Sequence, residues 1–560
     1  MPTILTPVTL WRDFDSELPL NEEILSERRE DGFVYREISF DGRDTGEGRV
    51  KIFACYAFPE GKEEFPAVMI LFEAGLGFDE DFYKRFLERG YGVLCVDYCG
   101  ANGTEKCTQY PQNVDYANYE RAGEHLMFAN PTAKETSWYE WAGVARYGVR
   151  YLATRKEVTN VGAVGLRTGG EILFKIAPYA PISCMISVCA AGWLAYRGID
   201  KFSDTQQIFN EERHRFIAGL DSQSYAPYVN CPVLLISAIN DAKYDYDRVY
   251  DTFRLINNKV EKSILFSAHG NGLVGSHSQE NINLFLDKYL KGRSVFISSP
   301  VTIGMEEDEK GNLTVRSEFD SKGEIREYGI FFTEKITDSK VRDWTRILGK
   351  SENLSDDNVG IIPLKTFSGS KRALVYAFAN YSNGFSVTSK ILEVTLDKQY
   401  TNSVPASRVV YTSADERNGF VGYRRRVRSV ADCFMKGKSE VTLKPGYGGI
   451  LGITAPSGIV SYRVGEPRYE PPEGASLQFD AYCKEDTSML VTFFLDADES
   501  ENAGYTAEVR IEGGGKWKNV LLEPDDFKSE TGAHLNGFKG VVSVRFLSQS
   551  EVLINNVIWI

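Results

Sequence analysis

Uniformly apolar segments alternate with amphipathic ones from about residue 33 to 293. Two runs with alternating apolar and polar residues come first, 33–40 and 50–58, and they predict a pair of antiparallel strands. Shorter runs that are apolar at nearly every position follow at 67–72, 91–98, 161–166, 182–190, 232–238 and 263–268. Runs of this kind predict parallel strands that are covered by helices on both faces.

The segments between these runs have apolar residues at helical spacing, for example 79–90, 140–155 and 246–258. A further helical segment, 279–292, closes the unit. Strands that alternate with helices in this way are typical of a doubly wound, mostly parallel sheet. The pattern therefore predicts one α/β domain over residues 1–293.

From residue 295 onward, apolar and polar residues alternate, and no convincing helix of ten residues occurs before residue 400. Turn residues (Gly, Asp, Ser and Asn) separate the alternating runs, which are 312–319, 327–334, 372–381 and 386–396. We therefore predict an immunoglobulin-like β-sandwich over residues 294–402. Longer runs, richer in Gly and aromatic residues, predict a second all-β domain over 403–560.

One strand-to-helix junction has the spacing of a catalytic turn. The predicted strand 161–166 runs into Gly165-Leu166-Arg167-Thr168-Gly169, and the helical segment 172–177 follows. In an α/β-hydrolase the nucleophile sits on a strained turn between a strand and a helix, with small residues two positions before and after it. This pattern places Arg167 at the nucleophile position.

On these residues the first domain resembles the α/β-hydrolase superfamily, and within it the dienelactone-hydrolase and acetyl-xylan-esterase type of carbohydrate esterase. The likeness covers about half of the chain, and it is carried by 136–146, 161–171, 231–241 and 284–292. It implies a serine at position 167, an acid after the strand 232–238 and a histidine after the strand 263–268. Asp241 occupies the acid position, but Arg167 replaces the serine. Two histidines, His269 and His277, follow the last strand, and His269 is the candidate because it comes directly after it.

Arginine cannot act as the nucleophile, because its guanidinium stays protonated and offers only donors. Thr168 is an alternative nucleophile, although it lies one residue beyond the apex of the turn. Glu73 follows the strand 67–72, where hydrolases of this type commonly carry His-Gly-Gly-like residues. A carboxylate there opposes the oxyanion of acyl transfer. We therefore expect a disabled serine site in which Asp241 and His269 are remnants.

Several interpretations of the altered site stay open. Arg167 could form an internal ion pair with Glu73 or Asp241, because a buried arginine needs a partner. Arg167 and the helix N-terminus at Thr168 could instead bind a carboxylate, such as that of a uronic acid or an acyl acid. His269 could be a loop residue without chemistry, or could act with Asp241 as a base in lyase or isomerase reactions.

The predicted function is therefore a carbohydrate-associated protein that binds an acidic or acetylated glycan, or another anion. The predicted binding residues are Arg167, Glu73, Thr168 and Asp241. The alternative function is an active carbohydrate esterase, or a related hydrolase, that uses an unrecognised nucleophile. The sequence indicates neither a bound metal nor a cofactor, because Cys95 and Cys99 form a close pair that no second Cys or His pair follows.

Residues 403–560 resemble galactose-binding-like jelly rolls, the fold of many carbohydrate-binding modules. The likeness is carried by 477–480, 516–520, 524–527 and 553–559. Aromatic side chains with nearby hydrogen-bonding groups are the usual means of sugar binding. Candidates are Tyr447, Tyr462, Tyr469 and Tyr505, whereas Trp517 and Trp559 are assigned to the core. A domain that only supports the α/β domain is the alternative interpretation.

Charge and composition narrow the list of partners. The net charge is −14, and the densest basic cluster, 424–428, is too short to follow a run of phosphates, which argues against nucleic acid. Neither a span of about 20 apolar residues nor a basic start with an apolar core appears, so a cytoplasmic protein without a membrane segment is expected, with a secreted mature form as the alternative. Nine cysteines, several of them in buried-strand patterns such as Cys184, Cys189 and Cys231, fit a reducing compartment.

Overall fold

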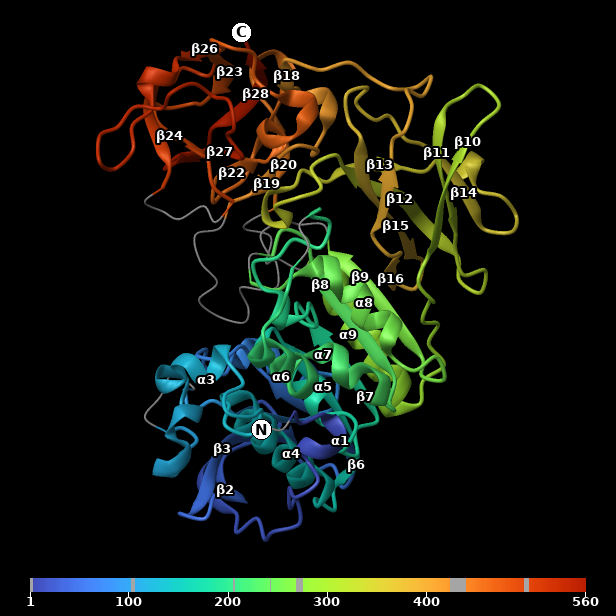
Figure 1. Ribbon diagram of the computed structural model, residues 1–560, viewed down its shortest axis with the longest axis vertical. Helices are drawn as coiled ribbons and strands as arrows, with labels where there is room; N and C mark the ends of the chain where they lie inside the picture. Colours follow the sequence, from blue (N-terminus) through green and yellow to red (C-terminus); the bar gives the residue numbers. More distant parts are fainter. Residues whose placement is uncertain are drawn as a thin grey trace.

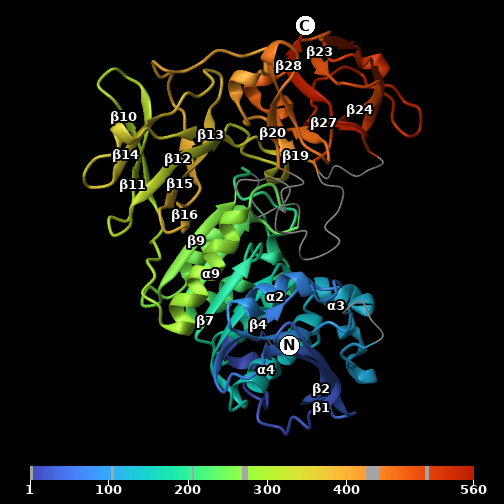
Figure 2. The ribbon, with the colours of Figure 1, turned by 180° about the vertical axis from the view of Figure 1, so that it is seen from behind.

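The computed structural model describes residues 4–101, 106–204, 207–241, 243–267, 275–423, 440–497 and 503–560. Three parts follow one another along the chain (Figure 1). The α-helices of the described chain lie in the first part. The second and third parts are β-rich and lie side by side beyond the β8–β9 end of the first (Figures 1 and 2). His269 and the cluster 424–428 lie outside the described residues.

A nine-stranded mixed sheet forms the first part, in the order β1-β2-β3-β5-β4-β6-β7-β8-β9. The pairs β1–β2, β2–β3 and β3–β5 are antiparallel, and every later pair is parallel. The strands are β1 (Glu23–Glu30), β2 (Phe33–Asp44), β3 (Arg49–Pro59), β4 (Phe65–Leu71), β5 (Gly92–Asp97), β6 (Val158–Leu166), β7 (Cys184–Val188), β8 (Val233–Ala238) and β9 (Lys262–Ser267).

Helices cover both faces of this sheet. Side chains of α4, α5 and α8 belong to the hydrophobic core on one face, and those of α2 and α9 to the core on the other. The helices are α1 (Pro7–Leu10), α2 (Glu80–Glu88), α3 (Gly123–Met127), α4 (Ser137–Ala153), α5 (Thr168–Ile176), α6 (Glu211–Gly219), α7 (Ser222–Tyr225), α8 (Val249–Leu255) and α9 (Ser276–Lys291). This arrangement fits an α/β-hydrolase domain.

The predicted strands of this domain are confirmed, and their burial explains why the sequence shows them. All residues of β5, β7 and β8 are buried, as the uniformly apolar runs require. The strand β1 was not expected, because each of its residues is exposed and its sequence, EILSERRE, has no apolar face. It pairs with the edge of β2 through the backbone, which leaves no apolar pattern to detect.

The second part consists of two antiparallel sheets, β10-β11-β14 and β13-β12-β15-β16, with β17 paired to β15. The strands are β10 (Thr302–Glu307), β11 (Leu313–Glu318), β12 (Ile325–Thr333), β13 (Thr345–Leu348), β14 (Val359–Pro363), β15 (Arg372–Tyr381), β16 (Ser386–Thr388) and β17 (Leu392–Thr395). The predicted run 386–396 is thus two strands, β16 and β17, and both pair with β15.

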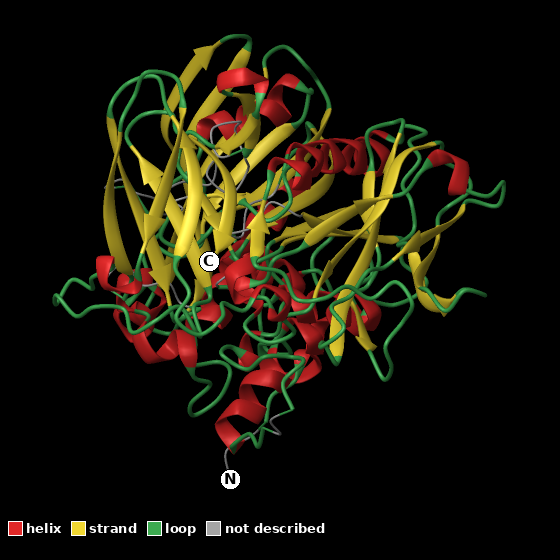
Figure 3. Cartoon of the chain, turned by 90° about the horizontal axis from the view of Figure 1, so that it is seen from above, coloured by secondary structure: helices red, strands yellow, loops and turns green. Residues whose placement is uncertain are grey.

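The third part is also built of two antiparallel sheets, β20-β21-β28-β23-β26, to which β18 is added, and β19-β22-β27-β24-β25. The strands are β18 (Val409–Tyr411), β19 (Val421–Gly422), β20 (Thr442–Pro445), β21 (Leu451–Thr454), β22 (Ile459–Ser461), β23 (Leu477–Tyr482), β24 (Thr487–Phe494), β25 (Tyr505–Ile511), β26 (Trp517–Leu522), β27 (Ser543–Ser548) and β28 (Leu553–Trp559). The strands of the two β-rich parts dominate the view from above (Figure 3).

The two tryptophans of the third part that were expected in the core, Trp517 and Trp559, differ in burial. Trp559 is fully buried in the core, as expected, but Trp517 is half-buried at the sheet edge, where its ring lies 5.5 Å from that of Tyr482. The core assignment of Trp517 was therefore wrong. In its strand, β26, the core-facing residues are Val520 and Leu522, so the alternation places Trp517 on the opposite, outer face of the sheet.

Buried polar groups join the three parts. Arg342 of the second part is fully buried and forms two hydrogen bonds with Asp247 of the first, at 2.7 and 2.9 Å. Glu466 of the third part accepts hydrogen bonds from the backbone N–H groups of Glu334, Lys335 and Asp343 in the second. Because both side chains are buried and form several hydrogen bonds across the boundaries, the contacts hold the parts in a fixed arrangement.

Candidate functional site

The predicted strained turn is present between β6 and α5. Arg167 has φ +54° and ψ −112°, a conformation that residues with a side chain rarely adopt. Its backbone N–H donates to the carbonyl of Val188, at 2.7 Å. A Cβ at Gly165 would lie 2.5 Å from the carbonyl oxygen of Gly169, and one at Gly169 would lie 2.1 Å from that of Leu71. The two glycines are therefore needed for the helix to approach the sheet this closely.

Arg167 points to the acid position. Its two terminal nitrogens donate to the two carboxylate oxygens of Asp241, at 3.0 and 3.2 Å, and the Arg167 side chain is only 11% exposed. The guanidinium also lies over the ring of Tyr244, 5.0 Å from its centroid. Such a two-pronged ion pair uses both oxygens of the acid that would otherwise orient a histidine. The structure thus contains the internal ion pair: Asp241 is the main partner, and Glu73 Oε2 lies 4.0 Å from the Nε atom of Arg167.

Glu73 occupies the place where an oxyanion would be held. In α/β-hydrolases one oxyanion donor is the backbone N–H of the residue after the nucleophile. Here that residue is Thr168, and its N–H donates to Glu73 Oε2 at 2.8 Å. The carboxylate therefore stands where a developing negative charge would have to lie, and Lys243 binds its other oxygen.

Thr168 and Tyr244 complete the group of side chains around Glu73. The hydroxyl of Thr168 lies 3.0 Å from Glu73 Oε2 and 2.8 Å from the hydroxyl of Tyr244. Burial raises the pKa of Tyr244 well above its ordinary value, so its hydroxyl stays protonated and serves as a donor. The backbone N–H groups of Lys243 and Tyr244 donate to Asp241, at 2.8 and 3.1 Å.

The structure thus brings together four of the residues singled out in the sequence: Arg167, Glu73, Thr168 and Asp241. Two cations, Arg167 and Lys243, balance two carboxylates, so the cluster is electrically neutral as a whole. Lys243 and Tyr244 also belong to the cluster, and no sequence pattern singles them out. They follow Asp241 in the loop after β8, where charged and aromatic residues are common, and only the folded loop turns them toward Glu73.

A second, fully buried charge cluster lies beneath the turn. Glu171 and Lys175 are in α5, Asp221 precedes α7, and none of the three is exposed. Glu171 accepts a hydrogen bond from the N–H of Ala191 at 2.6 Å. Burial is the largest cause that raises the pKa of Glu171 to about 7, and the charge of Asp221 adds to it, whereas Lys175 lowers it. The folded protein therefore holds a proton on Glu171 at a pH where the unfolded chain does not.

Because the folded protein binds this proton more tightly than the unfolded chain, we expect the free energy of unfolding to fall as the pH rises. The unfolded chain has the ordinary pKa of 4.5, so the stabilisation by protonated Glu171 is complete below about pH 4.5 and is lost as the pH rises through about 7. We expect the Glu171→Gln variant to remove this loss, which is on the order of 2 kcal/mol in the free energy of unfolding. Thermal unfolding of both proteins between pH 5 and 8 measures it. The exposed Glu88→Gln is the control, and equal slopes for all three proteins would refute the assignment.

A small pocket of about 130 Å³ opens beside the turn. Thr168, Lys243 and Tyr244 line it on the polar side. Its apolar walls are formed by Leu126, Met127, Trp138, Trp141, Leu194 and Phe216. Two arginines, Arg197 and Arg213, also line it, and within the described part of the chain neither forms an ion pair. The pocket therefore combines apolar walls with unmatched positive charge.

Comparison with known proteins adds no assignment of function. No family model matches the sequence, and no curated protein matches it. Among solved structures, the acetyl xylan esterase from Paenibacillus sp. R4 is similar, with 14% identity, 49% of this chain and 90% of that chain covered, and a TM-score of 0.36. Acetyl xylan esterase 1 from Thermoanaerobacterium sp. JW/SL YS485 is also similar, with 14% identity, 49% of this chain and 89% of that chain covered, and a TM-score of 0.37.

A third similar structure is a dienelactone hydrolase-like promiscuous phosphotriesterase from metagenomic libraries, with 15% identity, 43% of this chain and 83% of that chain covered, and a TM-score of 0.29. At these TM-scores the likeness supports no argument about the site. The fold assignment depends instead on the sheet order and on the turn at Arg167.

The second histidine after β9 and two of the candidate sugar-binding tyrosines lie away from the turn at Arg167. His277 lies at the start of α9, and its side chain is exposed. Of the tyrosines proposed for sugar binding, Tyr447 is 58% exposed and Tyr462 is buried. Among the described residues, no group of three or more His, Cys, Asp or Glu side chains is arranged to hold a metal ion, and no helix is long and apolar enough to cross a membrane.

Proposed function

We propose that this protein is a hydrolytically silent α/β-hydrolase-fold protein that binds a small organic acid beside the turn. The observation that carries the proposal is the two-pronged ion pair between Arg167 and Asp241 at the nucleophile position. A seryl mechanism needs a nucleophile, an acid that orients a base, and free oxyanion donors. Here Arg167 stands in place of the nucleophile and binds the acid, Asp241. Glu73 accepts the hydrogen bond from the N–H of Thr168, the group that would otherwise serve as an oxyanion donor.

The position of the ligand follows from the charges. Arg167 was expected to bind an anion, but Asp241 already takes both of its terminal nitrogens. Lys243 is likewise bound to Glu73. Arg197 and Arg213 at the neighbouring pocket are the cations without an ion pair in the described chain, so they support binding of the carboxylate there.

The walls of this pocket favour one of the two expected acids. Trp138, Trp141 and Phe216 offer apolar surface, which favours the hydrocarbon body of an acyl or aryl acid and gives a hydroxyl-covered uronic acid little to bind. The pocket of about 130 Å³ also favours a short acid over a long-chain one. We therefore propose a compact carboxylate with an apolar body as the ligand.

Benzoate binding measured by calorimetry tests the proposal. We expect Arg213→Gln to weaken benzoate binding by about tenfold, because one charge-assisted hydrogen bond is lost. Arg254→Gln, on the exposed side of α8, is the matched control and should leave the affinity unchanged. Absence of binding in a folded wild type, or equal affinity in both variants, would rule out this pocket as the site.

A hydrolase that acts through Thr168 is the second candidate function, and one contact favours it. The hydroxyl of Thr168 lies 3.0 Å from Glu73, a carboxylate that could accept its proton. Hydrolysis of 4-nitrophenyl acetate separates the two functions. The proposal expects the wild type to match the rate in buffer alone, whereas hydrolysis that is present in the wild type and lost in Thr168→Val would establish the second candidate.

A further inference from the structure

The loop that follows β7 forms part of the wall of the pocket beside the turn. We define it as residues 189–197, and two of its side chains, Leu194 and Arg197, line the pocket. Arg197 is exposed and Leu194 is partly exposed, so both offer surface to a ligand. The course of this loop therefore decides where one of the two pocket arginines lies.

The backbone of loop 189–197 is strained. Cys189, Ala191 and Trp193 all have positive φ angles, +51°, +66° and +59°. Residues with side chains rarely adopt this conformation, and they keep it only where the surrounding structure holds them. Such residues gather at ligand clamps and active sites, which agrees with the place of this loop at a pocket.

Two helices hold the first half of the loop. Glu171 of α5 accepts the N–H of Ala191 at 2.6 Å, and Thr252 of α8 donates its hydroxyl to the carbonyl of the same residue at 2.7 Å. The indole N–H of Trp193 donates to the Thr252 hydroxyl at 2.9 Å. Glu171 and Thr252 are both fully buried, so these bonds are shielded from water.

Asp221 holds the second half of the loop. Its Oδ2 atom accepts the N–H of Ala195 at 2.9 Å, two positions before Arg197. Its own backbone N–H donates to the carbonyl of Phe216, at 3.2 Å. Phe216 and Arg213 belong to α6 and also line the pocket. Asp221 thus joins the two segments that carry the two pocket arginines.

Asp221 acts on the pocket only through these two segments. It is fully buried, and it is not among the residues that line the pocket. Ala195 is itself 1% exposed, so the loss of its acceptor would leave a buried N–H group without a partner. A strained loop that loses this bond relieves both penalties by moving toward water, and Arg197 would move with it.

We propose that Asp221 is a positioning residue for this pocket: by accepting the N–H of Ala195 it sets the course of loop 189–197 and, with it, the place of Arg197. The inference rests on the proposed acid-binding function. Because the loop is held before a ligand arrives, little free energy is lost in ordering it when the acid binds.

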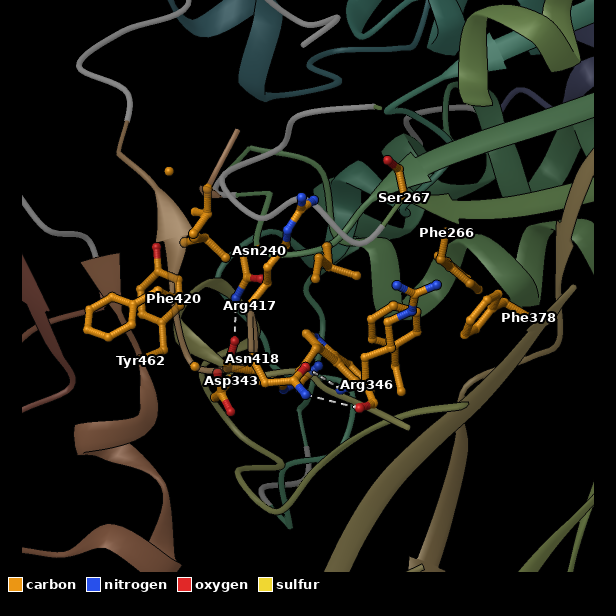
Figure 4. A pocket seen from close by; sticks show the side chains of 18 of the residues that line it. Asn240, Phe266, Ser267, Asp343, Arg346, Phe378, Arg417, Asn418, Phe420 and Tyr462 are labelled. Atoms are coloured by element: carbon orange, nitrogen blue, oxygen red, sulfur yellow. Dashed lines mark hydrogen bonds between the residues drawn. The ribbon is translucent and has the colours of Figure 1, made fainter. Parts of the chain in front are cut away.

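A larger cavity of about 260 Å³ lies where the three parts of the chain meet, and it is another place where a small acid could bind. Figure 4 shows side chains from all three parts around it, among them Asn240, Arg346 and Tyr462. Its lining residues differ from those of the pocket beside the turn, and none of them lies in loop 189–197. The Arg346→Gln variant therefore tests for binding in the larger cavity without a change in the loop.

Calorimetric titration of the full-length protein with benzoate tests the proposal. We expect Asp221→Ala to bind benzoate about tenfold more weakly than wild type. Asp221→Asn keeps an oxygen that can accept the N–H of Ala195, so its affinity should stay within about threefold of wild type. Asp287→Ala is the matched control, because Asp287 is only 3% exposed but lies in α9, on the other face of the sheet. It should lower the stability and leave the affinity unchanged.

Hydrogen–deuterium exchange of the ligand-free protein gives a second readout that does not depend on benzoate. We expect Asp221→Ala to raise the exchange rate of peptides that cover 191–197 by at least about tenfold, because the loop opens locally more often. Asp221→Asn and Asp287→Ala should leave the exchange of these peptides close to that of wild type.

The two readouts separate failure of this inference from failure of the acid-binding function. If folded wild type does not bind benzoate, the acid-binding function is removed, and the exchange of loop 189–197 alone decides whether Asp221 positions it. Unchanged exchange and affinity in Asp221→Ala would overturn the inference, and so would equal weakening in Asp221→Ala and Asp221→Asn. Weaker benzoate binding in Arg346→Gln would place the acid in the larger cavity and overturn it as well.

Discussion

Replacement of Arg167 by serine is expected to lower the free energy of unfolding by about 3–5 kcal/mol, because it leaves Asp241 buried without its cation. The Asp241 side chain is 2% exposed, and its remaining donors are the N–H groups of Lys243 and Tyr244. Urea denaturation monitored by tryptophan fluorescence measures the loss. The variant is also expected to hydrolyse 4-nitrophenyl acetate no faster than wild type, since Glu73 still occupies the N–H of Thr168.

The double variant Arg167→Ser with Asp241→Asn is the control for this effect. It removes both charges, so most of the lost stability should return. If the single variant is as stable as wild type, the ion pair contributes little and the turn is not locked by it. If the single variant gains esterase activity, the carboxylate of Glu73 does not block the oxyanion position.

Replacement of Arg342 by alanine is expected to have a similar effect, about 3–5 kcal/mol, on the contact between the first and second parts. Arg342 is fully buried, and its removal leaves Asp247, 1% exposed, without the cation that binds both of its oxygens. It also removes the donor to the hydroxyl of Tyr246, at 3.1 Å. We expect an earlier unfolding transition and faster proteolysis between residues 291 and 302, measured by calorimetry and limited digestion.

Arg372→Ala is the matched control, because Arg372 also joins the second part to the first. Its partner Asp204 is 86% exposed at a distance of 3.0 Å, and solvent-exposed pairs of this kind contribute roughly 0–1 kcal/mol. Equal destabilisation by the two variants would mean that burial of the Arg342 pair is not what holds the two parts together.

The strands of the first part could be predicted because burial on both faces leaves a direct trace in the sequence. The runs that became β4 to β9 are apolar at nearly every position, as two-sided burial demands. The short strands of the β-rich parts, such as β18, β19 and β22, were missed. Two or three residues in a strand are too few to establish an alternating pattern.

The candidate site was predictable in its residues but not in its contacts. The spacing of Gly165 and Gly169 placed Arg167 on a strained turn, and its φ of +54° agrees with that. How Arg167 would divide its contacts between Glu73 and Asp241 could not be predicted, because the position of Asp241 depends on the loop after β8. The cavity that Tyr462 lines could not be predicted at all. Tyr462 was considered for a sugar site within the third part, but residues of the first and second parts, more than a hundred positions earlier in the chain, also line this cavity.

The contact of Glu466 with the second part has a practical consequence for how this chain can be divided. Its carboxylate accepts three backbone N–H groups between residues 334 and 343 and the hydroxyl of Thr333. A protein truncated after residue 402 would leave those groups buried without an acceptor or exposed to water, with that loop free to rearrange. Fragments cut at the apparent boundaries are therefore poor substitutes for the intact chain. If the two β-rich parts were fused to another protein, both would have to be transferred together.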